Sequence, residues 1–276
     1  MNIWFAKRAA PIAALALGAG LAGCDVRIDS NWGEVEGVAL EELDMSGEAP
    51  DTIQLAGPDR VIISEGDELT ITLEGDAEAG EALRFDRNGD RLTIARDQSI
   101  FDGSGKAIVR MTLPAPENLE IAGSGEIQAA AVASNAELEI AGSGSITVDA
   151  VDAERLEVDI AGSGDVRAAG TADTLDIDIA GSGNVRLGEL LAEDVSVGIA
   201  GSGDVELASN GRVDASIAGS GDVRVTGSAT CHVTTAGSGS LTCRPADTAD
   251  EAATQEGSED ASEDAAETGA EDAAEE

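Results

Sequence analysis

Residues 156–168 read LEVDIAGSGDVRA, two short alternating segments joined by Gly-Ser-Gly. Positions 156, 158, 160, 166 and 168 hold apolar or small residues, and positions 157, 159, 165 and 167 hold charged ones. A period of two is typical of a β-strand that buries one of its faces. The stretch therefore predicts two strands that meet at a corner, where glycine permits a close approach of backbones.

The same pattern recurs along the chain at steps of 19, 20, 19, 20, 18 and 18 residues. The Ile-Ala-Gly-Ser-Gly segments, the last with Thr in place of Ile, begin at Ile121, Ile140, Ile160, Ile179, Ile199, Ile217 and Thr235. Such a short period is typical of a solenoid. Equivalent positions hold side chains of similar shape, as stacked parallel rungs about 4.8 Å apart require. The predicted fold is all-β, a right-handed parallel β-helix with rungs of 18–20 residues.

The rest of each rung is more variable. Residues 169–174 are Gly, Ala, Thr and Asp, a composition that predicts a turn. Residues 188–193 are less clear, because Leu190 and Leu191 could form a short third strand.

Upstream, the pattern continues in a degraded form. Residues 53–63 keep one glycine and the apolar spacing, and residues 69–75 repeat that arrangement. Residues 101–105 keep the corner with weaker flanks. We therefore predict a β-helical domain over 38–244, with irregular capping rungs over 38–115 and regular rungs over 116–244.

Residues 38–243 resemble the putative auto-transporter adhesin, head GIN domain family. The resemblance rests on the rung at 55–63, Gly66-Asp67 before Leu69, the strand at 91–94 and the repeated Ala-Gly-Ser-Gly. It implies a bacterial secreted or lipid-anchored protein with a right-handed parallel β-helix. It implies no catalytic residue.

The N-terminus carries a targeting signal. Lys7 and Arg8 precede an apolar segment over 9–20, which is too short to span a bilayer. Leu21-Ala22-Gly23-Cys24 then resembles the bacterial lipobox. We predict a signal peptide over 1–23, lipidation of Cys24, and an anchor and tether over 24–37. The predicted location is the cell envelope, on the periplasmic or outer surface of a bacterial membrane.

The formal net charge is −39, from 55 acidic and 16 basic residues. This charge excludes a nucleic-acid partner, because binding phosphates requires a basic patch. Residues 245–276 contain no basic residue and too little apolar surface to form a core. We predict that they form a disordered acidic tail.

Acidic residues also recur at two outward positions of the rungs. They are Glu120, Glu139, Asp159 and Asp178 at one position, and Glu137, Glu157 and Asp176 at the other. One interpretation is a strip of divalent cations that bridges this face to an anionic glycan or surface. The simpler interpretation is a solvated acidic face that prevents lateral aggregation. We favour the second and predict no metal site, although cation binding remains open.

Two cysteines besides Cys24 lie in the last rung. Cys231 and Cys243 occupy inward positions on its two strands. We predict that they form a disulfide that closes the C-terminal end of the helix. The alternative is a pair of buried free thiols, because cysteine behaves as a small apolar residue.

The composition gives little support to catalysis. Aromatic residues make up 2% of the chain, and its one histidine, His232, occupies an outward position. A glycosidase needs one particular pair of acids, and repeated acids single out none. We therefore predict no catalytic residue and no cofactor.

The predicted function is a non-catalytic, adhesin-like binding or structural module for a glycan or envelope protein. The alternative is a carbohydrate-active β-helix enzyme, a polysaccharide lyase or hydrolase. The sequence does not determine the oligomeric state.

Overall fold

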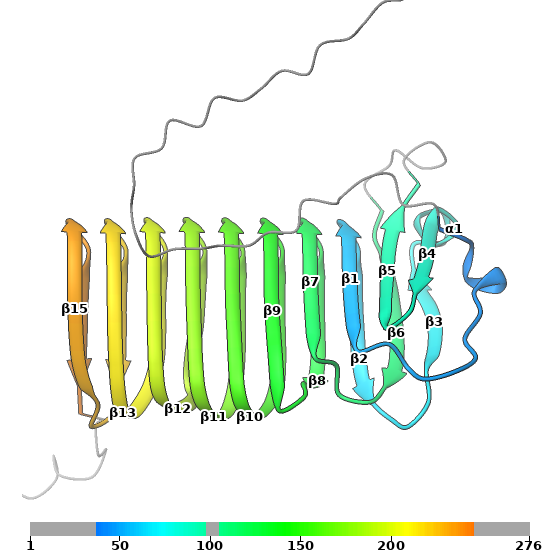
Figure 1. Cartoon of the computed structure of the whole chain (residues 1–276). Helices are drawn as coiled ribbons and strands as arrows, with labels where there is room; N and C mark the ends of the chain where they lie inside the picture. Colours follow the sequence, from blue (N-terminus) through cyan, green and yellow to red (C-terminus); the bar gives the residue numbers. More distant parts are fainter. Residues whose placement is uncertain (1–36, 98–104, 246–276) are drawn as a thin grey trace, which may run out of the picture. The chain divides into compact units, whose positions relative to one another are not determined.

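The computed structural model describes residues 37–97 and 105–245, which form a β-solenoid of about seven turns (Figure 1). The predicted signal peptide, Cys24, most of the tether and nearly all of the acidic tail lie outside these residues. Within the described part, no helix is long and apolar enough to cross a membrane.

The regular rungs stack in parallel. Their strands are β7 (Asn118–Gly123), β8 (Glu126–Ala131), β9 (Asn135–Gly142), β10 (Ser145–Gly162), β11 (Asp165–Gly181), β12 (Asn184–Gly201), β13 (Asp204–Gly219), β14 (Asp222–Thr226), β15 (Thr230–Gly237) and β16 (Ser240–Arg244). Val158 of β10 pairs with Leu138 of β9 and with Ile177 of β11, as the repeat predicts. The parallel β-helix is therefore confirmed.

The core is built from columns of like side chains. Ile160 is fully buried between its register partners Ile140 and Ile179. Burying an isoleucine stabilises the fold by roughly 1.5–3 kcal/mol, so the columns supply most of the packing energy. Outward residues alternate with these inward ones along each strand.

The Gly-Ser-Gly corners stack along one edge of the solenoid. Gly162 has a φ of +131°, and a Cβ there would overlap the carbonyl oxygen of Gly142 in the rung below. A Cβ on Gly164 would lie 2.6 Å from Cγ2 of Ile140. Both glycines are needed, because the chain turns sharply while the neighbouring backbone lies directly beneath it.

The prediction of a turn over 169–174 is wrong. Strand β11 continues through this segment, where Gly170 pairs with Val151 and Ala172 pairs with Ala153. Ala172 is buried, and Leu190 of the next rung is fully buried as well. The small residues fit a narrow third side of the solenoid, rather than a solvent-exposed turn.

The first rungs differ from the regular ones. They contain the 3₁₀ helix η1 (Leu40–Glu42), β1 (Thr52–Gly57), β2 (Arg60–Glu65), β3 (Thr70–Gly75), α1 (Ala77–Glu81), β4 (Leu83–Asn88), β5 (Arg91–Arg96) and β6 (Ala107–Leu113). Strand β1 pairs in parallel with β5 and β7, and β2 pairs in parallel with β6 and β8. Strand β4 lies antiparallel to β5.

The prediction that residues 69–75 repeat a parallel rung is also wrong. Strand β3 pairs antiparallel with β6, with Ile71 opposite Met111. Both kinds of strand alternate with a period of two, so the pattern alone does not distinguish them. The two antiparallel strands cover the open edge of the first parallel rungs (Figure 1).

The opposite end of the described solenoid is more polar. Thr235 of β15 takes the place that Ile217 holds in the rung before, and His232 takes the place of Asp214. Val233 remains 47% exposed, because no described rung covers it. A polar final repeat is typical of solenoids, whose last rung has a neighbour on one side only.

Candidate functional site

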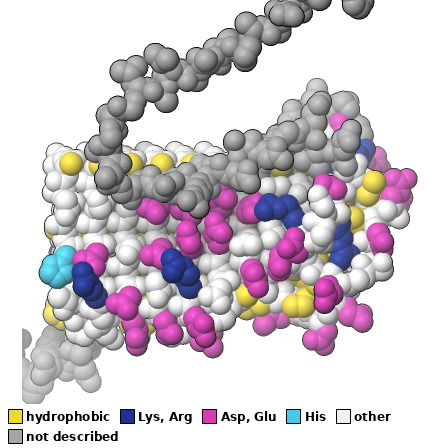
Figure 2. All heavy atoms as spheres, in the orientation of Figure 1, with side chains coloured by type: hydrophobic (Ala, Val, Ile, Leu, Met, Phe, Trp, Pro, Cys, Tyr) yellow, Lys and Arg dark blue, Asp and Glu magenta, His cyan; other side chains and the backbone are white. Residues whose placement is uncertain are grey.

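The strands that lead into the Gly-Ser-Gly corner carry an acidic outer surface. Figure 2 shows Asp and Glu side chains gathered on this side of the molecule. Seven residues define what we call the acidic face: Glu120, Glu137, Glu139, Glu157, Asp159, Asp176 and Asp178. They come from β7, β9, β10 and β11.

The seven residues form two columns in exact parallel register. In the first column, Glu120 pairs with Glu139, Glu139 with Asp159, and Asp159 with Asp178. In the second column, Glu137 pairs with Glu157, and Glu157 with Asp176. Neighbouring strands lie about 4.8 Å apart, so like charges are held close together along both columns.

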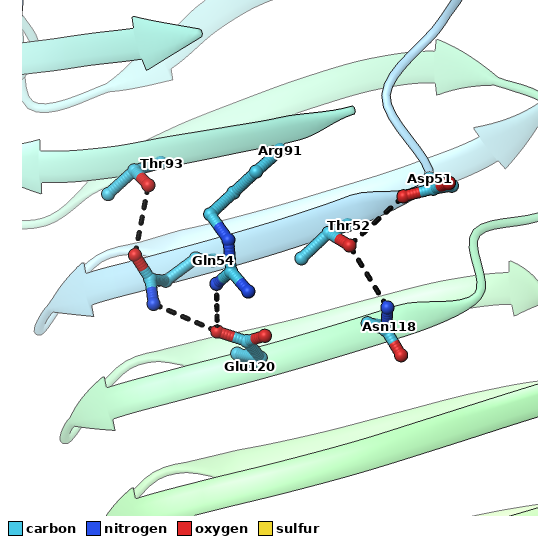
Figure 3. A network of polar contacts seen from close by, with 7 residues as sticks. All are labelled: Asp51, Thr52, Gln54, Arg91, Thr93, Asn118 and Glu120. Atoms are coloured by element: carbon cyan, nitrogen blue, oxygen red, sulfur yellow. Dashed lines mark hydrogen bonds and ion pairs between the residues drawn. The ribbon is translucent and has the colours of Figure 1, made fainter. Parts of the chain in front are cut away.

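Toward the N-terminus, the first column continues as a neutral polar network (Figure 3). Gln54 donates a hydrogen bond of 2.8 Å to Glu120, and its amide oxygen accepts one of 2.9 Å from Thr93. Arg91 forms an ion pair with the same Glu120 carboxylate. Glu120 is therefore neutralised at this end of the acidic face.

The second column has its own network at this end. Asn118 donates a hydrogen bond of 3.0 Å to the hydroxyl of Thr52, which in turn donates one of 3.0 Å to Asp51 (Figure 3). Asn118 is also the register partner of Glu137, so the column changes from acidic to neutral at β7.

On the other side, a second arginine partly neutralises the acidic face. Arg155 forms an ion pair with Asp176, and its Nε lies 3.9 Å from a carboxylate oxygen of Glu157. No such ion pair reaches Glu137, Glu139, Asp159 or Asp178 among the described residues. At the centre of the acidic face, Glu137 and Glu139 are thus compensated only at a distance, by the charge of Arg91.

The pKa values reflect this arrangement. Burial, and then the charges of Glu120, Glu137 and Asp159, raises the pKa of Glu139 to about 7. Burial, and then the charges of Glu157 and Asp178, raises the pKa of Asp159 to about 7. The pKa values of Glu137 and Asp178 are raised as well, in each case first by burial.

Glu139 is the most enclosed member of the acidic face. It is 9% exposed, and its Oε1 atom has no hydrogen-bond partner. A buried carboxylate oxygen without a partner costs free energy, so an atom of this kind points to a missing ligand or to a proton.

Three acids at the centre also converge. Glu137, Glu157 and Asp159 each offer a carboxylate oxygen, and these oxygens all lie within 4.8 Å of one another. Beyond β11 the columns change to Ser196, Gly198 and Ser216, and these small residues line a shallow groove that continues from the acidic face.

The structure places the other predicted residues at the C-terminal end. It joins Cys231 and Cys243 through a disulfide, with their Cα atoms 6.8 Å apart. Cys243 is exposed, because no described rung lies beyond it. His232 lines the far end of the groove as the register partner of Asp214. The repeat alone does not single out Gln54, Arg91 or Arg155. Gln54 holds the position of Glu120 in the degraded rung over 53–63, but its polar contacts come from other strands.

The fold and the acidic face define a class of protein: a parallel β-solenoid with one continuous, charged outer sheet. A model of the putative auto-transporter adhesin, head GIN domain family matches residues 49–229, and the chain belongs to this family. Among curated proteins, none matches the sequence.

Several solved structures share the fold. A putative adhesin from Bacteroides fragilis superposes with a TM-score of 0.68 at 21% identity, covering 73% of this chain and 94% of that one. A putative lipid binding protein from Parabacteroides distasonis has a TM-score of 0.58 at 21% identity, with 71% and 93% covered. A putative adhesin from Parabacteroides merdae has a TM-score of 0.58 at 18% identity, with 73% and 94% covered.

Proposed function

We propose that this chain is a lipid-anchored, non-catalytic binding module of the bacterial cell envelope, which uses its acidic face to hold a glycan or protein partner. Membership of the adhesin head family supports the binding role. The lipobox-like segment that ends at Cys24 supports an anchor outside the cytoplasm. The oxidised pair Cys231 and Cys243 is consistent with that compartment.

One observation carries the binding role: the acids repeat in register over four strands and form a surface instead of a single pair. Glycoside hydrolysis requires two carboxyl groups at one defined separation, with distinct environments. Here Glu139 and Asp159 are neighbours in one column, and their pKa values shift in the same direction. Equivalent groups suit multivalent contact with an extended partner better than the separate roles of acid and base.

The binding role is tested with labelled full-length chain and washed envelope fragments. We expect saturable binding by the wild type and at least a fivefold loss in the double variant Glu157→Gln/Asp176→Asn. A matched control, Glu206→Gln/Asp165→Asn, removes two charges from a different side of the solenoid and should bind like the wild type. Equal loss in both variants would indicate that net charge, not the acidic face, determines binding.

The non-catalytic role is tested with a panel of neutral and anionic polysaccharides. We expect no release of reducing ends or unsaturated products. Turnover that disappears in Glu157→Gln/Asp176→Asn and persists in the control would overturn this part of the proposal, in favour of a carbohydrate-active enzyme.

The anchor is tested separately. In a bacterial host, the wild type should incorporate labelled fatty acid and sediment with membranes, whereas Cys24→Ser should do neither. Equal labelling of the two chains would contradict lipidation of Cys24 and leave the binding role untouched.

A further inference from the structure

We propose that the centre of the acidic face is a calcium site, in which Glu137, Glu157 and Asp159 supply carboxylate oxygens and the unpartnered carboxylate of Glu139 lies beside them. This inference goes beyond the proposed function and does not depend on it. The four residues come from two neighbouring strands, β9 and β10. They pair in register as Glu137 with Glu157, and Glu139 with Asp159.

The ligand atoms are close enough to share one cation. One carboxylate oxygen from each of Glu137, Glu157 and Asp159 lies within 4.8 Å of the other two. Calcium binds oxygen at about 2.3–2.6 Å with flexible geometry, so three oxygens inside this limit can all reach one calcium ion. Magnesium needs oxygens at about 2.0–2.1 Å in a strict octahedron, and a flat sheet surface provides this geometry poorly.

Glu139 provides an independent observation. It lies two residues from Glu137 on β9, so both side chains project from the same side of the strand. The residue is 9% exposed, and its Oε1 has no hydrogen-bond donor. Its neighbour in the next rung is Asp159. A bound cation would give this oxygen the partner that the protein itself does not provide.

The charges around the centre favour an external cation. Among the described residues, Arg91 pairs with Glu120, and Arg155 with Asp176 and more distantly with Glu157, and neither arginine reaches Asp159 or Glu139 in an ion pair. A divalent ion would compensate the charges of two carboxylates at once.

The exposure of the three ligands also sets the expected affinity for calcium. Glu137, Glu157 and Asp159 all keep part of their surface in contact with solvent, so water would complete the coordination. Sites of this open kind in extracellular modules have dissociation constants of about 10⁻⁴–10⁻³ M. The site would therefore respond to calcium outside the cytoplasm.

The test is calorimetric titration of the purified full-length chain with calcium chloride at pH 7.5, at constant ionic strength. We expect one saturable site, weakened at least tenfold by Asp159→Asn and at least threefold by Glu139→Gln. Glu206→Gln removes one carboxylate from another side of the solenoid and should bind calcium within twofold of the wild type. Magnesium should bind at least fivefold more weakly than calcium.

Three results would overturn the proposal: no saturable binding, an equal effect of Asp159→Asn and Glu206→Gln, or equal affinity for magnesium. Circular dichroism first establishes that each variant is folded. Asp159→Asn and Glu139→Gln should fold, because each removes repulsion between carboxylates and keeps the shape of the side chain. Calcium should also raise the melting temperature of the wild type and leave that of Asp159→Asn unchanged. Because no partner is present, failure here is distinguishable from failure of the envelope-binding test.

Discussion

Asp59 and Arg96 form a buried ion pair beneath the first parallel rungs. The Asp59 side chain is 1% exposed and the Arg96 side chain 6%. Nε of Arg96 donates a hydrogen bond of 3.1 Å to Asp59, and the backbone N–H of Ala107 donates another of 2.8 Å. The pair therefore joins the loop after β1 to the end of β5 and the start of β6.

We expect Asp59→Ala to destabilise the chain by about 3–5 kcal/mol, because it removes the buried carboxylate that accepts hydrogen bonds from Nε of Arg96 and from the Ala107 N–H. Urea unfolding, with hydrogen exchange of β6, measures the loss. The exposed pair of Arg110 and Glu74 is the control, and Glu74→Ala should cost less than about 1 kcal/mol. Similar losses in the two variants would contradict a special role for the buried pair.

The glycine corner provides a second prediction. Gly162→Ala should destabilise the chain by about 3 kcal/mol or more, because it combines a positive φ with an overlap of Cβ and the Gly142 carbonyl oxygen. Thermal unfolding measures the effect. Gly188→Ala is the matched control: its Cβ would meet only the Glu206 carboxylate at 3.4 Å, so the change should stay within about 0.5 kcal/mol. A mild effect at Gly162 would mean that the corners rearrange easily.

The regular rungs could be predicted because each inward residue has a counterpart of similar shape 18–20 positions away. That spacing alone placed Val158 against Ile177, and Glu139 beside Asp159. The repeat thus specified the acidic columns together with the core.

Other features carried no such signal. The small residues of 169–174 suit a turn and a narrow inner side equally well, and only Leu190 in the next rung indicated a strand. Asp59 and Arg96 lie 37 residues apart in irregular rungs, where no repeat relates them. The burial of Glu139 depends on packing around an outward position, which a period of two marks as exposed.

The cysteine pair leads to a third prediction. In chain isolated from the envelope, Cys231 and Cys243 should resist alkylation until a reductant is added, as mass spectrometry would show. Reduction should loosen β15 and β16, and the expected loss is about 2–3 kcal/mol for the short loop that the bridge closes. Hydrogen exchange of these strands measures it. The double variant Cys231→Ser/Cys243→Ser should not respond to reductant. Ready alkylation of both thiols without reductant would contradict the bridge.

The acidic face gives the final prediction, on pH in the presence of a chelator. Folding raises the pKa of Glu139 from 4.5 to about 7 and that of Asp159 from 3.8 to about 7. Between these limits the folded chain binds more protons than the unfolded chain, so stability falls as pH rises from about 4.5 to 7. The groups that face Glu139 are Glu120, Glu137 and Asp159, with Arg91 opposing their effect.

Glu139→Gln should remove part of this slope and stabilise the chain by roughly 1–2 kcal/mol at pH 8, less than the full pKa shift implies, because the surrounding face reaches solvent. Urea unfolding at pH 5 and pH 8 measures the difference. Glu206→Gln removes a carboxylate from another side of the solenoid and should keep the wild-type slope. If the free energy of unfolding varied with pH in the same way for the wild type and Glu139→Gln, the repulsion between the carboxylates would already be screened by solvent. Replacing the chelator with calcium should flatten the wild-type profile, because the bound ion takes over the role of the proton between Glu139 and Asp159.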